Sequence, residues 1–167
     1  MSISKSVNLG VEAEVAFKMR TKLVGPGVTA ATALPAVESA MPALELPDFM
    51  FSGKPRAADY IASSIVAQAI ALGRPVERLE GLNLATESVE YDHNGEIVGT
   101  YTTAEVMGNP LNALAWLANH LGARGIALKP GDIVMSGAIS KLLRPKSGDT
   151  IGAKFTHLGL VSVKIVA

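Results

Sequence analysis

The sequence is most informative first through what it lacks. Its 167 residues include no cysteine, which excludes a disulfide framework, a thiolate metal site and a thiol nucleophile. Fifteen basic and fifteen acidic residues leave no net charge, whereas a nucleic-acid binder needs a basic surface to displace counterions from phosphates. No apolar run approaches the ~20 residues of a membrane-spanning helix, and residues 1–5 lack the apolar core of a secretory signal. We therefore expect a cytoplasmic protein that binds neither nucleic acid nor membrane.

Hydrophobic residues are plentiful, at 49% of the chain. That content excludes an intrinsically disordered protein and is sufficient for a sizeable core. The length matches one domain, so residues 1–167 are expected to form a single domain that binds a substrate or a cofactor.

The clearest local pattern is the strict alternation of residues 11–18. A period of two is typical of a half-buried strand. Its apolar face consists of Val11, Ala13, Val15 and Phe17. The opposite face carries Glu12 and Glu14, so both carboxylates point the same way.

Turn and cap residues delimit the other elements. Asn94 and Gly95 suit the positive φ angles of a tight hairpin. Asn109 is a natural helix N-cap before Pro110, and Trp116 on that helix is expected to pack against a sheet. Further strands are expected at 37–46 (irregular at Pro42), 67–72, 88–92, 96–102, 133–136, 150–155 and 160–166, with helices at 29–36, 57–66 and 110–123 and a loop at 49–56.

Strands outnumber helices in this pattern, and their turns are tight. This combination favours an α+β fold in which a mixed sheet curls into a barrel or roll with a few packed helices, rather than a doubly wound sheet.

Glu12 and Glu14 form the first candidate site. Residues two apart on a strand lie roughly 7 Å apart on one face, where two carboxylates repel by about 2 kcal/mol at an effective dielectric of ~20. A divalent cation would remove that repulsion and use the pair as hard oxygen ligands. A solvated strand face that happens to carry two glutamates is the alternative, and spacing alone favours it.

A third acid would favour the metal, and Glu45 is the candidate. Apolar residues flank it on both sides, where an unpaired charge is costly to bury. In the alternative interpretation Glu45 lies at a strand end and reaches water. Asp48 and Asp59 are weaker acidic candidates in the same stretch.

Several motifs then resemble one family, and they cover nearly the whole chain in that family's order. They are GVEAEVAF at 10–17, LVGPGVT at 23–29, PALE at 42–45, GNPLNALAWLAN at 108–119, GDIVMSG at 131–137, and GD at 148–149 before HLGLVS at 157–162. Together they resemble the 2-keto-4-pentenoate hydratase and 4-oxalocrotonate decarboxylase group of the fumarylacetoacetate hydrolase superfamily.

The resemblance implies that superfamily's mixed β-roll and a Mg²⁺ or Mn²⁺ site. The family's paired glutamates and third acid correspond to Glu12, Glu14 and Glu45. Magnesium keeps positions open for a chelating ligand, and a 2-oxo acid offers a carboxylate and a keto oxygen to them. The implied substrate is therefore a small 2-oxo acid.

The catalytic groups carry over less directly. The family's segment before the Glu-x-Glu strand contributes a lysine and an acid, and only nine residues precede Gly10 here. Asp59 keeps its place, whereas the family's pocket serine falls on Val66, which leaves Ser64 or its neighbour Ser63 as the substitute. Lys141 lies near a family loop that approaches the substrate, with a surface position as the alternative. The expected catalytic residues are Asp59, Ser64 and Lys141.

Two classes of function follow from the resemblance. The first is a metal-dependent lyase that hydrates a short 2-hydroxydienoic acid such as 2-hydroxypenta-2,4-dienoate, with 4-oxalocrotonate-type decarboxylation or acylpyruvate C–C hydrolysis as other reactions on the same scaffold. The second is a shortened, non-catalytic subunit that associates with a related hydratase or decarboxylase. In either case we expect a dimer or larger assembly, because a short family member should expose apolar surface.

Overall fold

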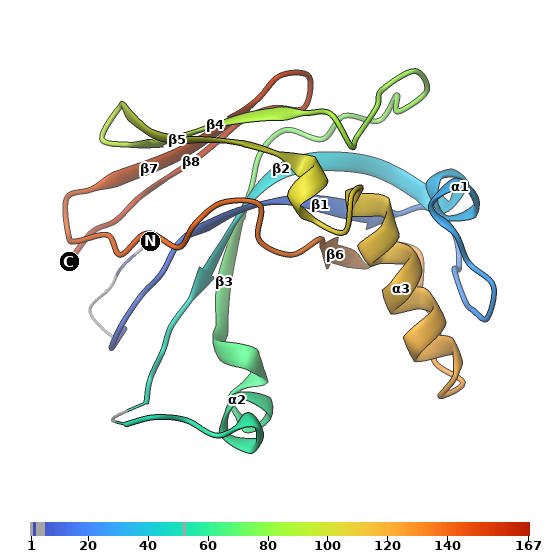
Figure 1. Cartoon of the computed structure of the whole chain (residues 1–167), viewed down its shortest axis with the longest axis horizontal. Coiled ribbons are helices and arrows are strands. Elements are labelled where there is room, and N and C mark those ends of the chain that lie inside the picture. Colours follow the sequence, from blue (N-terminus) through green and yellow to red (C-terminus); the bar gives the residue numbers. More distant parts are fainter. Residues whose placement is uncertain (1, 3–5, 52) are drawn as a thin grey trace.

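Two four-stranded sheets pack face to face, and helices lie at their edges (Figure 1). This computed structural model describes residues 2, 6–51 and 53–167; Ser52, inside the expected loop, lies outside the described residues. The strand order is β3-β2-β1-β6 in the first sheet and β5-β4-β7-β8 in the second. The strands are β1 Glu12–Met19, β2 Val37–Pro47, β3 Ala67–Leu72, β4 Ser88–His93, β5 Glu96–Thr102, β6 Ile133–Met135, β7 Thr150–Phe155 and β8 Gly159–Lys164.

The core lies between the two sheets. From β1 it takes the four apolar residues expected to share a face, each fully buried, and from the second sheet it takes Tyr91 and Phe155. The Tyr91 hydroxyl donates a hydrogen bond of 2.7 Å to the Val11 carbonyl and so joins the sheets directly. The period-two prediction for β1 is confirmed.

The opposite face of β1 is less exposed than a half-buried strand predicts. Glu14 is only 3% exposed, and Ala16 is fully buried against Met41 and Ala43. The expected irregularity at Pro42 is wrong, because Pro42 pairs with Val15 in register. The first sheet therefore continues unbroken across the acidic residues.

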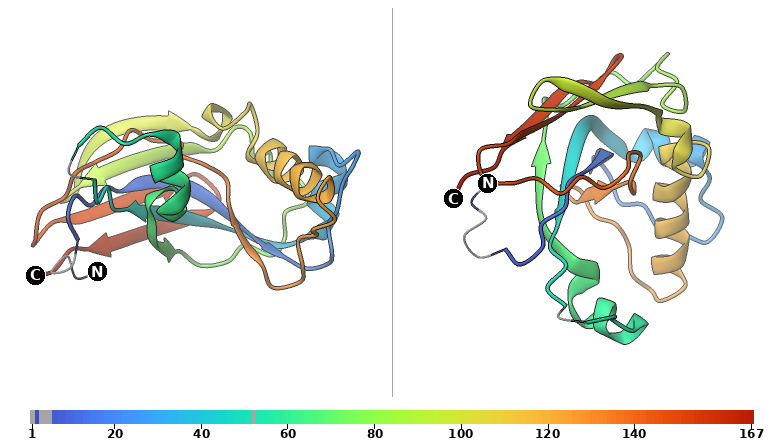
Figure 2. Two further views of the ribbon diagram at one scale, coloured as in Figure 1. Left: turned by 90° about the horizontal axis from the view of Figure 1, so that it is seen from below. Right: turned by 60° about the vertical axis from the view of Figure 1, so that its left-hand side comes forward.

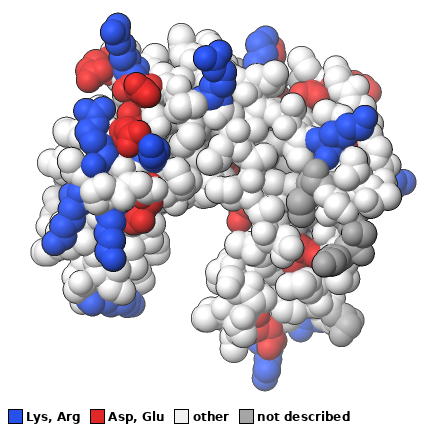
Figure 3. Space-filling view, turned by 180° about the vertical axis from the view of Figure 1, so that it is seen from behind, with Lys and Arg blue, Asp and Glu red and all other residues white. Residues whose placement is uncertain are grey.

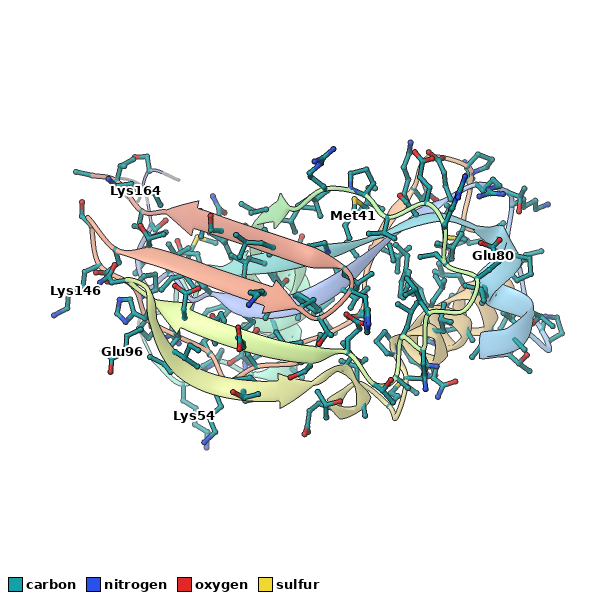
Figure 4. The ribbon with its side chains drawn as sticks, turned by 90° about the horizontal axis from the view of Figure 1, so that it is seen from above. Met41, Lys54, Glu80, Glu96, Lys146 and Lys164 are labelled. Atoms are coloured by element: carbon teal, nitrogen blue, oxygen red, sulfur yellow. The ribbon has the colours of Figure 1, made fainter. Side chains whose placement is uncertain are left out.

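The second sheet is a set of tight hairpins. Asn94 and Gly95 take φ angles of 56° and 83° between β4 and β5, as their sequence predicts. The Asn94 amide donates to Asp149 at 3.0 Å, which ties this turn to the turn before β7. Glu96 and Lys146 accordingly lie at the same end of the sheet (Figure 4).

The helices begin at the expected caps. They are α1 Ala30–Ala33, α2 Ala57–Ala62 and α3 Pro110–Gly122, with 3₁₀ turns at Leu34–Ala36, Ser64–Val66 and Thr103–Glu105. Thr29 caps α1 and Asn109 caps α3 through their side-chain oxygens. Trp116 does not pack against a sheet: it is 56% exposed and stacks on His120 with ring centroids 4.9 Å apart. His120 lies one turn further along the same helix, so the Trp116 ring packs on its own helix and not on a sheet.

The segment between α2 and β3 has an unusual backbone. Ser64, Ile65 and Val66 have φ angles of 54°, 56° and 60°, so three consecutive residues other than glycine are left-handed. Each costs roughly 1–2 kcal/mol relative to a right-handed conformation. The helix expected at 57–66 therefore ends at Ala62, and the chain reverses into β3.

The expected α+β fold of curled sheets with few helices is confirmed. Pairing within both sheets is antiparallel, and Ser2 forms a parallel bridge to Val166. Helices α2 and α3 both project from the side of the first sheet that faces away from the second (Figure 2). Among the described residues, no helix has the length and apolar character needed to cross a bilayer; the cytoplasmic location stays a prediction.

Candidate metal centre

The three predicted acidic ligands lie on one face of two paired strands. Glu12 and Glu14 are on β1, and Glu45 on β2 is directly opposite Glu12 in the antiparallel register. Opposite residues have Cβ atoms about 4.5–5.5 Å apart and point to the same side of a sheet. Two segments some thirty residues apart along the chain thus bring their carboxylates together.

This face is turned away from the core. The apolar residues of β1 fill the space between the sheets, so the alternating glutamates point to the other side, from which α2 and α3 project. From behind, the molecule is hollowed between the lobe with α3 and the lobe with α2, and acidic atoms reach the surface at the inner end of the hollow (Figure 3).

Glu14 is the most buried of the three. Its Oε2 accepts a hydrogen bond of 2.8 Å from the Gly137 amide. Burial raises the pKa of Glu14 to about 8; the Gly137 hydrogen bond opposes this rise, and the charges of Glu45 and Glu12 add to it. Without a cation, this carboxyl group therefore holds its proton at neutral pH.

Glu12 and Glu45 show the same tendency. Burial raises the pKa of Glu45, and burial together with the charge of Glu45 raises that of Glu12, while the Arg144 cation lowers it. Among the described residues, neither carboxylate receives a side-chain hydrogen bond or forms an ion pair within 4 Å. The three groups influence one another and lack the positive charge that would hold them all ionised.

The donor set fits a hard divalent cation. Carboxylate oxygens are the ligands that Mg²⁺ and Mn²⁺ prefer, and a bound cation would relieve both the repulsion and the burial cost. In the conformation described, no three His, Asp or Glu side chains of residues 2, 6–51 and 53–167 already form a closed ligand set. Glu12 and Glu45 are only partly buried, which leaves their side chains room to adopt other rotamers.

Apolar side chains surround the acids on the same face. Ile70 is opposite Glu45 across β2 and β3, and Leu72 is opposite Ala43; the two are 46% and 40% exposed. On the other flank, Met135 of β6 packs against Ala16. A cation here would lie within a surface suited to a short hydrocarbon chain.

The expected catalytic residues are more scattered. Asp59 lies on α2, where its carboxylate accepts a hydrogen bond of 2.8 Å from the Arg56 amide and pairs with that guanidinium at 3.3 Å. Ser64 is exposed in the left-handed turn, and Lys141 is exposed after β6. Among the described residues, no hydrogen bond or ion pair joins any of them to the glutamates, and their catalytic roles stay predictions.

Other residues of the site were not singled out from sequence. The hydroxyl groups of Ser136 and Ser140 accept hydrogen bonds from the Val15 and Ala13 amides, and Gly137 between them holds Glu14. The only signal for Ser136 and Gly137 was the GDIVMSG motif, which ends before Ser140. Arg144 gave no signal, because its proximity to Glu12 depends on pairing between Val11 and Leu143.

Comparison with known proteins finds hydratases and decarboxylases that are similar to this chain. A 2-hydroxyhexa-2,4-dienoate hydratase from Comamonas testosteroni is 32% identical over 154 residues, covering 92% of this chain and 58% of the hydratase. A 4-oxalocrotonate decarboxylase from Pseudomonas putida is 32% identical over 164 residues, covering 98% and 62%. The chain thus spans about three fifths of the length of these curated relatives.

A solved structure shows the same fold. The 4-oxalocrotonate decarboxylase from Pseudomonas putida G7, complexed with magnesium and adipate, superposes with a TM-score of 0.92 at 29% identity, over 99% of this chain and 64% of that one. The family described as fumarylacetoacetate (FAA) hydrolase C-terminal matches residues 2–166. This chain therefore belongs to the fumarylacetoacetate hydrolase family.

Proposed function

We propose that the chain is a catalytic domain that binds Mg²⁺ or Mn²⁺ through Glu12, Glu14 and Glu45 and acts as a lyase on a short 2-oxo or 2-hydroxydienoic acid. Hydration of a 2-hydroxydienoate such as 2-hydroxypenta-2,4-dienoate is the proposed reaction. The relatives named hydratases and the magnesium-bound decarboxylase structure support the reaction class and the metal.

The observation that carries this proposal is the placement of three carboxylates on one half-open face without cationic partners of their own. Surface glutamates normally reach water or a basic side chain. Here burial raises the pKa of all three, and the charge of neighbouring glutamates adds to the rise for Glu12 and Glu14. A fold tolerates such a cost most readily where ligand binding recovers it.

Each group has a distinct role in the reaction. The bound cation supplies a Lewis acid that withdraws electron density from the 2-oxo group. The Gly137 amide orients Glu14, while Glu12 and Glu45 close the ligand set from two strands. Ile70 and Leu72 cover the hydrocarbon part of the substrate, so that water reaches the double bond from a limited direction.

Decarboxylation is the second candidate, and a specific observation supports it. A decarboxylase is among the similar curated proteins and is also the protein of the superposed structure. Both reactions use electron withdrawal at a 2-oxo acid. They differ in product, because decarboxylation releases CO₂ and hydration does not.

The test combines metal binding with turnover. Calorimetric titration of the purified chain with Mn²⁺ is expected to show binding that releases protons, since Glu14 must ionise to become a ligand. Loss of 2-hydroxypenta-2,4-dienoate absorbance should then require Mg²⁺ or Mn²⁺, and CO₂ release from 4-oxalocrotonate distinguishes the decarboxylase. Absence of Mn²⁺ binding would refute the proposed site.

Glu14→Gln provides the matched variant. It removes a ligand charge at constant volume and should weaken Mn²⁺ binding by more than about 100-fold, since even outer partners of a metal site change affinity by 10–100-fold. Glu90→Gln is the control, because Glu90 pairs with Lys154 on the second sheet. Mn²⁺ binding without turnover of any dienoate would favour the non-catalytic partner subunit.

The proposal includes assembly into a dimer or larger oligomer, with itself or with a related hydratase or decarboxylase subunit. Large apolar side chains are exposed near α2 and on β5, and such surface favours association. They include Ile61, Ile65, Ile97 and Val98. Light scattering is expected to give at least twice the chain mass; a stable monomer would contradict this part of the proposal.

A further inference from the structure

One cation lies beside the acidic face without a carboxylate partner. Arg144 is close enough to Glu12 for its charge to lower the pKa of that carboxyl group. No Asp or Glu of the described residues forms an ion pair with it within 4 Å. Its guanidinium group is therefore available to an anion from solution.

Arg144 points to the same side as the glutamates. Leu143 forms an antiparallel bridge with Val11, and Leu143 packs against the core as Val11 does. Side chains alternate along the extended segments that this bridge joins, so the next residue, Arg144, points to the opposite side, where Glu12 lies; the effect of its charge on Glu12 agrees with this placement. The bridge puts Arg144 beside Gly10, two residues from Glu12, which corresponds to roughly 7 Å along the strand.

The guanidinium group is held in place before any ligand arrives. Its Nη1 donates to the carbonyl and side-chain oxygens of Asn8 at 2.7 and 2.8 Å, and its Cζ lies over the Phe49 ring, 4.4 Å from the ring centroid. The Asn8 segment is itself fixed, because its amide donates to buried Asp48 at 2.6 Å. These contacts occupy Nη1 and one face of the guanidinium group, which leaves the Nε and Nη2 donors for a carboxylate.

We propose that Arg144 makes the site prefer a 2-oxo dicarboxylate to the corresponding monocarboxylate, by binding the second carboxylate of an acid whose 2-oxo acid end is held at Glu12, Glu14 and Glu45. This inference rests on the proposed function, because it needs a metal-bound 2-oxo acid as its starting point. The apolar face around the acids accommodates the carbon chain between the two ends. An acid without the distal carboxylate gains nothing from Arg144.

The test compares matched acids in the presence of Mn²⁺. Calorimetric titrations use 2-oxohexanoate and 2-oxoadipate, which share a six-carbon chain and differ in the distal carboxylate. The wild-type chain is expected to bind 2-oxoadipate about 10-fold more tightly, as one charge-assisted contact provides. The five- and seven-carbon 2-oxo dicarboxylates then measure the reach between the metal and Arg144.

Arg144→Gln should reduce that preference to within about 2-fold while leaving 2-oxohexanoate and Mn²⁺ binding in place, and Arg144→Lys should retain part of it. Lys154→Gln, which removes a positive charge that is paired with Glu90 on the second sheet, should keep the wild-type preference. Retained binding of 2-oxohexanoate shows that each variant is folded.

Two results would overturn the inference, and they are distinguishable. Mn²⁺-dependent binding of both acids with no dicarboxylate preference, or with a preference that survives in Arg144→Gln, refutes the role of Arg144 and leaves the proposed function standing. Failure of either acid to bind with Mn²⁺ refutes the proposed function, and the inference falls with it.

Discussion

A buried carboxylate beside the second sheet and one in the first sheet differ in how many hydrogen bonds they accept. In the second sheet, buried Glu87 accepts hydrogen bonds from the His157 ring at 2.6 Å and from the His157 and Leu158 amides at 2.7 and 3.2 Å. In the first sheet, Glu14 is almost as buried, yet it accepts one hydrogen bond, from Gly137. The Glu87 carboxylate stabilises the turn between β7 and β8, whereas the Glu14 carboxylate lies on the same face as two other carboxylates.

This difference separates structural from functional burial. A buried charge with several donors stabilises the surrounding fold, while one with few donors and like-charged neighbours costs stability until a ligand binds. The left-handed turn precedes β3 of the first sheet, and β3 itself carries exposed apolar side chains. Costly features are concentrated on the side of the molecule that carries the proposed site.

The largest expected effect is the pH dependence of stability without metal. Because the pKa of Glu14 is raised from 4.5 to about 8, the folded state retains a proton that the unfolded state loses between these values. The free energy of unfolding should therefore fall as pH rises from about 4.5 to 8, by on the order of 4 kcal/mol at about 1.4 kcal/mol per pKa unit. Urea unfolding at several pH values measures this.

The corresponding variant tests the cause. Glu14→Gln should flatten this pH dependence and stabilise the metal-free protein at pH 8, and saturating Mn²⁺ should flatten it in the wild type. A slope that is unchanged in Glu14→Gln would show that the two sheets do not differ as described.

Removal of the Glu87 carboxylate should lower the free energy of unfolding, whereas Glu14→Gln should raise it at pH 8. Glu87→Ala leaves the buried Leu158 amide without its acceptor, and an unsatisfied buried donor costs about 1–3 kcal/mol; His157, which is exposed, can donate to water instead. We expect a loss of about 2 kcal/mol in the free energy of unfolding by urea. Glu87→Gln, which keeps one acceptor oxygen, should lose less; a stabilised Glu87→Ala would contradict the contrast with Glu14.

The left-handed turn offers a smaller effect. Ile65→Gly should stabilise the protein by about 1 kcal/mol, because glycine relieves a left-handed conformation that costs roughly 1–2 kcal/mol and Ile65 is already 60% exposed. Ile61→Gly is the control: that side chain is 72% exposed within α2, so the change should destabilise by about 1 kcal/mol. Equal signs for the two variants would argue against strain at Ser64–Val66.

The smallest effect is expected at the exposed pair of Glu90 and Lys154, whose charged atoms lie 3.1 Å apart. Lys154→Met should change the free energy of unfolding by less than about 1 kcal/mol, since exposed ion pairs contribute little. Thermal unfolding in low and high salt measures the change. A larger loss would mean that the acids of the second sheet matter for more than their hydrogen bonds.

Local patterns predicted most of the elements. The alternation at 11–18, the Asn94-Gly95 turn and the Asn109 cap each depend on neighbours within a few residues, and all three are confirmed. The exact limits of β3 and β7 were also predicted. The exposure of Trp116 and the turn at Ser64–Val66 were not predicted. A helix pattern shows neither which face a neighbouring sheet covers nor where the backbone becomes left-handed.

The same distinction between local patterns and long-range packing applies to the site. The sequence by itself determined that Glu12 and Glu14 share a face, because side chains on a strand alternate with a period of two. Only the tertiary structure decided that Glu45 pairs with Glu12, that Gly137 reaches Glu14 and that Arg144 lies nearby without an acidic partner. Those relations depend on strand register and on burial, which arise when segments far apart in the chain pack together and exclude water.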